Sequence, residues 1–368
     1  MSVSGGGANR SPLRPIAPGL PHAGAAGASA LDVGTMIESV LGSDVFAGRA
    51  QLCQATNTIA GPSPDYVVAI PARNEAELLP RCILGLSRAM GQPDARGALV
   101  FVIHDSSDLS FDLVADALIT ADIEGLAIDL TLDPQIRDAP HARRFALDVA
   151  ALLCPEGVLL ISDADTRVGA GWCRDMLAVT QSGYDLVCED IRLDEEELAR
   201  LPERVRQIGE AERAFFDASN ALWDRWTGGV HGIFAHRPSG ASMALRSAAY
   251  ETLGALPLPP SGEDVALCDA ALEAGCKVVT LPDCGTRTSA RIYGRAAGGC
   301  GAALNERASH DDPLCDGRLM PLEDLRRLAA SIAALPAGRR GEAARSRSRP
   351  LRYSELRVEL GKANALLG

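Results

Sequence analysis

The sequence predicts an α/β fold, in which a mostly parallel sheet is flanked by helices, with a disordered N-terminal segment and a helical C-terminal tail. Three observations support this class. Short apolar runs alternate with segments of helical periodicity, the connections between them are short, and three of the apolar runs end in polar loops. In sheets of this kind ligands bind beyond the carboxyl ends of the strands, so the polar loops mark the candidate site.

The first half of the chain carries most of this alternation. Residues 1–30 are rich in Gly, Ala, Pro and Ser without periodicity, which is typical of disorder, and residues 31–41 predict a short helix. The run "YVVAI" at 66–70 predicts a buried strand, and the apolar positions of 78–86 recur at helical spacing. The elements that follow are strands at 98–104 and 157–162 and helices at 111–119 and 143–153.

The second half is more helical. The charged stretch 192–226 predicts one or two helices inserted after the sheet, and a helix at 262–275 precedes a strand at 277–282. An amphipathic helix is predicted at 321–335, and residues 337–352 predict a loose connection to a last helix.

Composition and charge exclude several classes of partner. The 368 residues, 47% of them hydrophobic, suffice for one large or two modest domains with a core. The formal net charge is -12, from 36 Lys+Arg against 48 Asp+Glu. This balance argues against nucleic acid or an anionic membrane as the main partner, because both attract basic surfaces.

The ten cysteines predict a reduced protein. None are spaced as C-x-x-C, no Cys/His tandem for zinc is present, and several (Cys82, Cys154 and Cys268) lie in apolar or helical patterns. No stretch approaches the roughly 18 apolar residues of a membrane span, and the start of the chain lacks the apolar core of a signal peptide. We therefore expect a cytoplasmic protein without a transmembrane segment, which leaves peripheral membrane contact open.

Two aspartates follow the apolar run 157–162 directly. In an extended backbone residues two apart project to the same side, so Asp163 and Asp165 converge while Ala164 points away. Such oxygen pairs suit Mg²⁺ or Mn²⁺, which complete their shells with substrate phosphates and water. The alternative is that one aspartate caps the helix that follows.

The loop after the first strand has the same ambiguity. Asn74 and Glu77 are spaced like a capping box, which explains the local sequence without a function. A cap does not explain Arg73 and Glu75, which are both polar and both follow the end of a buried strand.

Two further acidic positions stand at element ends. Asp105 follows the strand at 98–104, where it is placed to accept hydrogen bonds from a base or ribose, although the next residues are also competent helix caps. Glu263 and Asp264 begin a helix, as its dipole favours, and the pair would also make a plausible general base.

Several catalytic motifs are absent from the sequence. The glycine-rich stretch 294–304 lacks the G-x-x-x-x-G-K-[ST] of a P-loop and does not sit between a first strand and helix. Neither H-E-x-x-H nor G-x-S-x-G occurs, so the zinc protease and serine hydrolase classes lack support.

Five motifs in order resemble the family 2 glycosyltransferases with the GT-A fold: "PARNEAELLPRCILGL", "HDSSD", "DADT", "GASMALRSAAYETLG" and "GEDVAL", over about residues 66–300. The resemblance implies a GT-A, Rossmann-like sheet and transfer of a sugar from a nucleoside diphosphate to an acceptor hydroxyl, with inversion, as in hexosyltransferases. It implies a GT-A domain at 31–310, with a nucleotide-sugar half at about 66–166 and an acceptor half at about 167–310. Residues 311–368 would be a helical extension.

The resemblance also assigns roles to residues. Asp105 would read the base, favouring a UDP-sugar, and Asp163 and Asp165 would hold Mn²⁺ or Mg²⁺ on the diphosphate. Asp264 would be the catalytic base, with Glu263 beside it. The nucleotide sugar would lie along Pro71, Ala72, Arg73, Glu75, Asp105, Arg143 (or Arg144), Asp163 and Ala164. The acceptor side would comprise Gly240, Ala241, Arg291 and Arg295.

The sequence departs from the family pattern in one place. Members often carry a histidine after the strand behind the "ED" helix as a further metal ligand, and here Thr288, Ser289 and Arg291 occupy that region. Either the metal role is weaker or arginines share in neutralising the leaving phosphate. No Q-x-x-R-W of processive synthases occurs.

Three alternatives stay open. A nucleotidyltransferase also combines an α/β sheet, paired aspartates and Mg²⁺, but it typically opens with a glycine- and arginine-rich loop that "PARNEAELL" does not match. A catalytically weak nucleotide-sugar-binding protein of the same fold would keep the motifs without turnover. A retaining transferase on the same fold is the third.

Overall fold

The computed structural model describes residues 31–228, 236–294, 298–332 and 349–368. The predicted disordered segment 1–30, the candidate residue Arg295 and most of the predicted loose connection 337–352 lie outside the described residues. Among the helices described, none combines the length and the apolar character that crossing a lipid bilayer requires.

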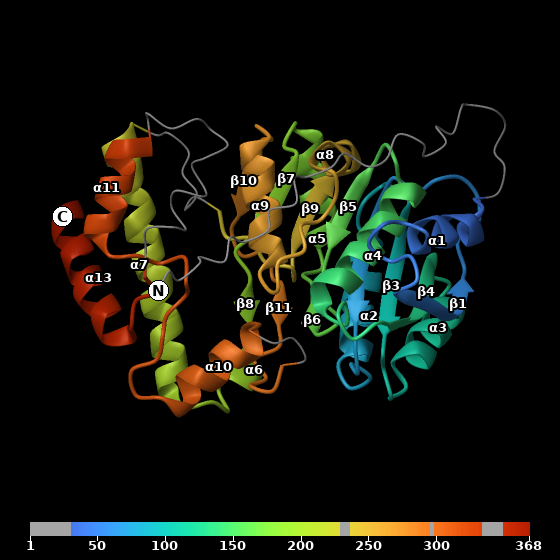
Figure 1. Cartoon of the computed structure of the whole chain (residues 1–368), viewed down its shortest axis with the longest axis horizontal. Coiled ribbons are helices and arrows are strands. Elements are labelled where there is room, and N and C mark those ends of the chain that lie inside the picture. Colours follow the sequence, from blue (N-terminus) through green and yellow to red (C-terminus); the bar gives the residue numbers. More distant parts are fainter. Residues whose placement is uncertain (1–30, 229–235, 295–297, 333–348) are drawn as a thin grey trace, which may run out of the picture.

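An eight-stranded sheet forms the centre of the described chain, in the order β1-β4-β3-β2-β5-β9-β7-β10 (Figure 1). Strands β4, β3, β2 and β5 pair in parallel, as do β7 and β10, whereas β1 and β9 run antiparallel to their neighbours. The predicted mostly parallel α/β sheet is therefore confirmed. The strands are β1 (Ala50–Asn57), β2 (Tyr66–Ala72), β3 (Gly97–His104), β4 (Gly125–Leu132), β5 (Val158–Ile161), β7 (Leu186–Glu189), β9 (Met243–Arg246) and β10 (Val278–Leu281).

Helices cover both faces of the centre of this sheet, which explains why the central strand β2 is apolar along its whole length. All seven residues of β2 are buried, and they alternate between two hydrophobic clusters: Val67 lies in one, Val68 in the other. The first cluster includes residues of α1 (Val33–Leu41), α4 (Ala139–Leu153), α8 (Ser247–Leu253) and α9 (Glu263–Glu273). The second includes residues of α2 (Leu79–Met90), α3 (Ser110–Thr120) and α5 (Trp172–Gln181).

A helical layer lies beyond the β10 edge of the sheet (Figure 1). The charged stretch 192–226 forms α6 (Glu195–Leu198) and the long α7 (Glu203–Thr227), and α11 (Leu322–Ile332) and α13 (Tyr353–Leu367) pack against α7. Phe215, Trp223 and Leu356 are buried in the hydrophobic cluster between them. The helical C-terminal tail is thus confirmed, while the division of the chain at residue 310 stays a prediction.

A second, three-stranded sheet joins segments that are far apart in the sequence. In it β11 (Arg287–Thr288) pairs with both β6 (Thr166–Arg167) and β8 (Arg192–Leu193). Because Thr288 is paired with Thr166, the segment after β10 is brought next to the aspartates that follow β5. α10 (Cys300–Ser309) comes after this segment and packs on α7.

The capping box predicted at Asn74 and Glu77 is wrong. Helix α2 begins at Leu79 and its N-terminal cap residue, Leu78, makes no side-chain capping hydrogen bond. Asn74 instead adopts a left-handed backbone (φ 51°), and its side-chain oxygen accepts a hydrogen bond from the backbone N–H of Ser107 (2.8 Å). The competing partner lies in the next loop, which the local sequence pattern does not reveal.

Substitution by alanine should have opposite effects on stability at two glycines, Gly157 and Gly209. A Cβ added at Gly157 would lie 2.1 Å from the backbone oxygen of Asp65 and 2.3 Å from the Cys154 sulfur. We expect Gly157→Ala to lower the free energy of unfolding by about 1–3 kcal/mol, because backbone must move to make room. Gly209, inside α7, has open space around it, so Gly209→Ala should raise the free energy of unfolding by about 0.5–1 kcal/mol. Urea unfolding monitored by circular dichroism measures both, and equal effects would contradict the tight contact at Gly157.

Candidate active site

The topology brings the predicted polar loops to one edge of the sheet. Strands β3, β2 and β5 are neighbours and run in parallel, so Asp105, Arg73 and Asp163 follow strands that end at the same edge. Strand β9 runs the other way, so Gly240, which precedes it, also lies at this edge. Pro71, Ala72, Ala164 and Ala241, all buried, belong to the same strand ends.

Hydrogen bonds tie the loop after β2 to the loop after β3. The Asp108 carboxylate accepts bonds from the backbone N–H groups of Ala76 (3.0 Å) and Ser110 (3.0 Å). The Ser110 hydroxyl in turn accepts one from the backbone N–H of Glu75 (2.9 Å). These bonds fix the backbone of Glu75, whose side chain is buried and faces the aspartates after β5 through a shared arginine.

Asp163 and Asp165 each pair with a different arginine. Asp163 Oδ1 lies 2.6 Å from Nη2 of Arg143, and Asp165 Oδ2 lies 3.0 Å from Nη2 of Arg291. The Thr288 hydroxyl donates to the other oxygen of Asp165 (3.2 Å). The alternative that one aspartate caps the next helix is wrong, because α5 begins beyond Gly171, with no side-chain capping bond.

Arg143 links the aspartate loop to the start of α9. Its guanidinium is buried, and it bonds Asp163, Glu263 (Nε to Oε1, 3.1 Å) and the carbonyl oxygen of Gly240 (3.1 Å). A Cβ at position 240 would lie 2.6 Å from Nη2 of Arg143, so only glycine permits this approach. Arg144, the other candidate for this position, pairs with Asp148 (2.6 Å).

Asp264 occupies a different environment from Glu263. Its two carboxylate oxygens accept hydrogen bonds from the backbone N–H groups of Gly240 (3.0 Å) and Val265 (2.8 Å). Burial, followed by the nearby charge of Glu263, raises the pKa of Asp264 above its usual range. Within the described residues no basic side chain lies within 4.0 Å of the Asp264 carboxylate, whereas Glu263 has Arg143. Asp264 is therefore the better proton acceptor of the pair.

Arg291, predicted on the acceptor side, contacts residues predicted on the nucleotide side. Its guanidinium makes a two-pronged contact with Glu75, in which Nη1 lies 2.7 Å from Oε2 and Nη2 reaches Oε1. The same Nη2 bonds Asp165, so Arg291 lies between two carboxylates.

Asp105 is already engaged by the protein. Its carboxylate pairs with Nε of Arg137 (3.0 Å) and accepts a hydrogen bond from the backbone N–H of Leu132 (3.2 Å). Its side chain is 10% exposed and its backbone is left-handed (φ 45°). A base that bonded this carboxylate would share it with Arg137.

The site contains more negative than positive charge. Arg143 pairs with Asp163 and Glu263, and Arg291 pairs with Glu75 and Asp165, while Asp264 has no ion pair with a basic side chain among the described residues. Burial and the neighbouring Asp163 raise the pKa of Asp165 to about 7, despite the opposing charge of Arg291. An additional cation at Asp165 would relieve this excess.

A divalent cation fits this donor set in part. Among the described residues no group of three or more His, Cys, Asp or Glu side chains could hold a metal ion alone. Mg²⁺ and Mn²⁺ are commonly held by one or two carboxylates together with substrate phosphates and water. Asp163 and Asp165 supply two such carboxylates, so the residues fit a cation that arrives with a phosphate-bearing ligand.

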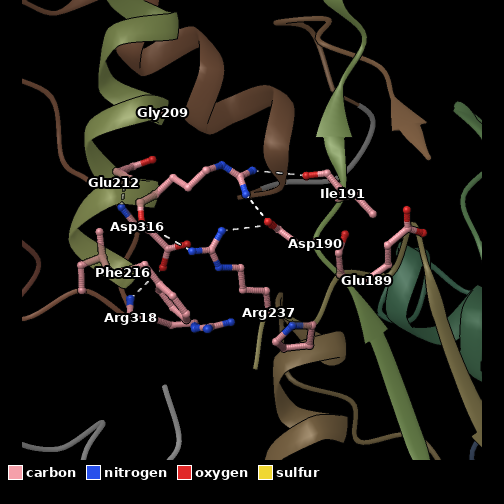
Figure 2. A pocket seen from close by; sticks show the side chains of 13 residues that line it. Glu189, Asp190, Ile191, Gly209, Glu212, Phe216, Arg237, Asp316 and Arg318 are labelled. Carbon is pink, nitrogen blue, oxygen red and sulfur yellow. Dashed lines mark hydrogen bonds and ion pairs between the residues drawn. The ribbon is translucent and has the colours of Figure 1, made fainter. Parts of the chain in front are cut away.

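A pocket of about 230 Å³ lies beside the helical layer (Figure 2). It lies between the end of β7, helix α7, the segment before β9 and a turn of the C-terminal extension. Asp190 pairs with Arg237 (3.0 Å) and with Arg213 inside it, and Ser239 on its wall is the neighbour of Gly240. Glu189 and Asp190 are not among the residues predicted for a site, although they follow a short apolar run as Asp163 does.

This chain is similar to known proteins only at the level of solved structures, and only at low sequence identity. No protein-family model matches the chain, and no curated protein matches it. S. aureus TarS 1–349 in complex with UDP-GlcNAc aligns at 14% identity and TM-score 0.47, over 76% of this chain and 70% of that one. The chain spans 35% of another TarS structure.

Two further solved structures are similar at the same level. The mannosyltransferase PcManGT from Pyrobaculum calidifontis, in complex with GDP-Man and Mn²⁺, aligns at 17% identity and TM-score 0.44, over 90% of this chain and 98% of that one. Glucosyl-3-phosphoglycerate synthase from Mycobacterium tuberculosis, with Mg²⁺ and UDP, aligns at 14% identity and TM-score 0.38, over 76% and 83%. With every TM-score here below 0.5, these likenesses assign no activity to this chain.

The raised pKa of Asp165 predicts a pH-dependent stability effect. An unfolded aspartate ionises near pH 4, whereas the pKa of Asp165 in the folded protein is about 7. Between these values the folded state holds a proton that the unfolded state has lost, so the ionisation of Asp165 destabilises the fold as pH rises. Asp165→Asn should therefore raise the free energy of unfolding by about 1–3 kcal/mol at pH 8 and by roughly a third as much at pH 5.

Asp163→Asn is the matched control, measured by urea unfolding at both pH values. It removes a partner of the buried Arg143, so it should lower the free energy of unfolding by about 1–3 kcal/mol. Destabilisation by Asp165→Asn at pH 8 would contradict the charge excess inferred at this site.

Proposed function

We propose that this protein is an inverting glycosyltransferase that moves a sugar from a nucleoside diphosphate sugar to an acceptor hydroxyl. The observation that carries the proposal is the ionic network at one edge of the sheet. Arg143 joins Asp163, from the loop after β5, to Glu263 at the start of α9, next to Asp264. A pair of metal-suited carboxylates and a carboxylate suited to accept a proton therefore lie at the same edge of the sheet, joined through Arg143.

The donor would bind at the ends of β2, β3 and β5. Asp163 and Asp165 would hold Mn²⁺ or Mg²⁺ on the diphosphate, and their charge excess supports this role. When bound, the cation acts as a Lewis acid that stabilises the charge of the departing diphosphate. Arg73 and Asp105 would lie along the nucleotide. The family resemblance implies that Asp105 reads the base, which favours a uridine nucleotide.

The acceptor would be deprotonated by Asp264. Its hydroxyl oxygen would attack the anomeric carbon from the face opposite the diphosphate, the bond to the diphosphate would break, and the hydroxyl proton would pass to Asp264. The backbone N–H groups of Gly240 and Val265 orient this carboxylate, and its raised pKa favours proton uptake. The pocket in Figure 2, beginning one residue from Gly240, is the space we assign to the acceptor.

A panel of nucleotide sugars with Mn²⁺ tests the proposal and separates it from its rivals. We expect slow release of the nucleoside diphosphate by donor hydrolysis, fastest with a UDP-sugar. Release of pyrophosphate from a nucleoside triphosphate and sugar phosphate would indicate a nucleotidyltransferase, and binding without release would indicate a catalytically weak binding protein. Once an acceptor is found, the anomeric NMR signal of the product distinguishes inversion from retention.

The chemical step predicts a large effect of one substitution. General base catalysis is typically worth about 10²–10⁴-fold, so Asp264→Asn should reduce the rate of transfer by that order and leave donor affinity nearly unchanged. Glu263→Gln should also perturb Arg143, its ion-pair partner, and so reduce donor affinity as well as rate. Steady-state kinetics with both variants measures the split, and near-normal transfer in both would reject the assigned base.

The metal role predicts a binding effect. Asp165→Asn should abolish most of the Mn²⁺-dependent affinity for UDP, since it removes one of two charged metal ligands. Asp175→Asn, which alters a carboxylate paired with Arg174 on the outside of α5, is the matched control and should bind as the unmodified protein does. Isothermal titration calorimetry with and without EDTA measures this, and UDP binding indifferent to EDTA would remove the metal from the site.

A further inference from the structure

Arg291 is held against Asp165 by contacts on several sides. Its two-pronged bond to the buried Glu75 fixes the plane of the guanidinium, and the same Nη2 that reaches Glu75 lies 3.0 Å from Asp165 Oδ2. The position is therefore a built feature of the site, in which one guanidinium nitrogen serves two carboxylates.

The backbone around Arg291 is fixed by an independent set of bonds. Glu197, from α6, accepts hydrogen bonds from the hydroxyl of Ser289 (2.6 Å) and the backbone N–H of Ala290 (2.7 Å). Arg81 pairs with the same glutamate (2.6 Å) and donates to the backbone carbonyl of Asp165 (3.1 Å). The segment that carries Arg291 is thus tied to the aspartate loop at a second point.

We propose that Arg291 is a resident counter-cation of Asp165, which an incoming divalent cation must displace and which then binds the diphosphate that accompanies it. This inference rests on the proposed function and adds to it a mechanism of cooperation between metal and donor. The affinity of the protein for the metal should therefore be much higher when a diphosphate is present than when the metal is alone.

Charge repulsion is the physical reason. A divalent cation bonded to Asp165 would lie within a few ångströms of the guanidinium that bonds the same carboxylate, and like charges at that distance repel. A diphosphate offers Arg291 a new partner, because the planar guanidinium fork matches phosphate oxygens. Metal and diphosphate would then each increase the affinity of the protein for the other.

Electron paramagnetic resonance of free Mn²⁺ tests this without any turnover. Mn²⁺ is titrated into the full-length protein alone and again with saturating UDP, and the ratio of the two dissociation constants gives the cooperation. In the unmodified protein we expect this ratio to lie in the range usual for coupled sites, roughly 5–150-fold. In Arg291→Gln we expect Mn²⁺ alone to bind more tightly, so the ratio should fall. Arg287→Gln is the matched control: Arg287 lies on β11, four residues before Arg291, and pairs with Asp283, so this substitution should leave both constants unchanged.

A second variant guards against misfolding. Arg291→Gln alone leaves the buried Glu75 without its guanidinium partner, so the double variant Glu75→Gln/Arg291→Gln removes both charges together. Unchanged or weaker binding of Mn²⁺ alone in both variants would overturn the inference.

Failure of the proposed function is read separately. If Asp165→Asn, introduced into Arg291→Gln, leaves Mn²⁺ affinity unchanged, the metal site itself is wrong and the inference falls with it. If Mn²⁺ binds more tightly in Arg291→Gln but no nucleotide sugar in the panel is turned over, the counter-cation stands and the transferase proposal fails.

Discussion

The buried guanidinium of Arg143 is the interaction on which the site depends. A buried positive charge is costly unless it is paired and hydrogen-bonded, and here two carboxylates and the carbonyl of Gly240 satisfy it. These partners come from three separate segments: the loop after β5, the start of α9 and the approach to β9. The Arg143 side chain on α4 bonds partners from all three segments and so fixes their relative positions. A hydrophobic contact, which has no preferred direction, would not do this.

The ionised carboxylates of the site lower the stability of the fold. The pKa values of Asp165 and Asp264 are raised first by burial and then by the charge of a neighbouring carboxylate, Asp163 for Asp165 and Glu263 for Asp264. Such strain is common where a site is complementary to a ligand rather than to itself, because selection for function accepts a loss of stability. In this protein the missing complement is positive, which agrees with a metal ion carried in by a substrate.

The sequence predicted the parts of the site better than their connections. The apolar runs and the acids that follow them located Asp163, Asp165 and Asp264, because strand burial and strand ends are local features. It did not predict that Arg291 reaches Glu75, since that contact spans most of the fold and depends on the small sheet of β6, β11 and β8. Strands β1, β4, β7 and β9 of the central sheet were also not predicted. Local rules failed where a partner from another loop competed, as at Asn74.

The turn at Asp316–Leu319 has a consequence for how such a protein would diversify. This turn belongs to the C-terminal part of the chain, yet Arg318 stacks over Phe216 of α7 on the wall of the pocket, 5.0 Å from the ring centre (Figure 2). The ionic network around Arg143 draws its residues from α4, the loop after β5 and α9 instead. If the pocket receives the acceptor, one part of its wall, formed by Asp316, Arg318 and Leu319, is encoded apart from the residues assigned to the donor. A lineage could then exchange one substrate for another by altering its tail, and leave inherited donor chemistry intact.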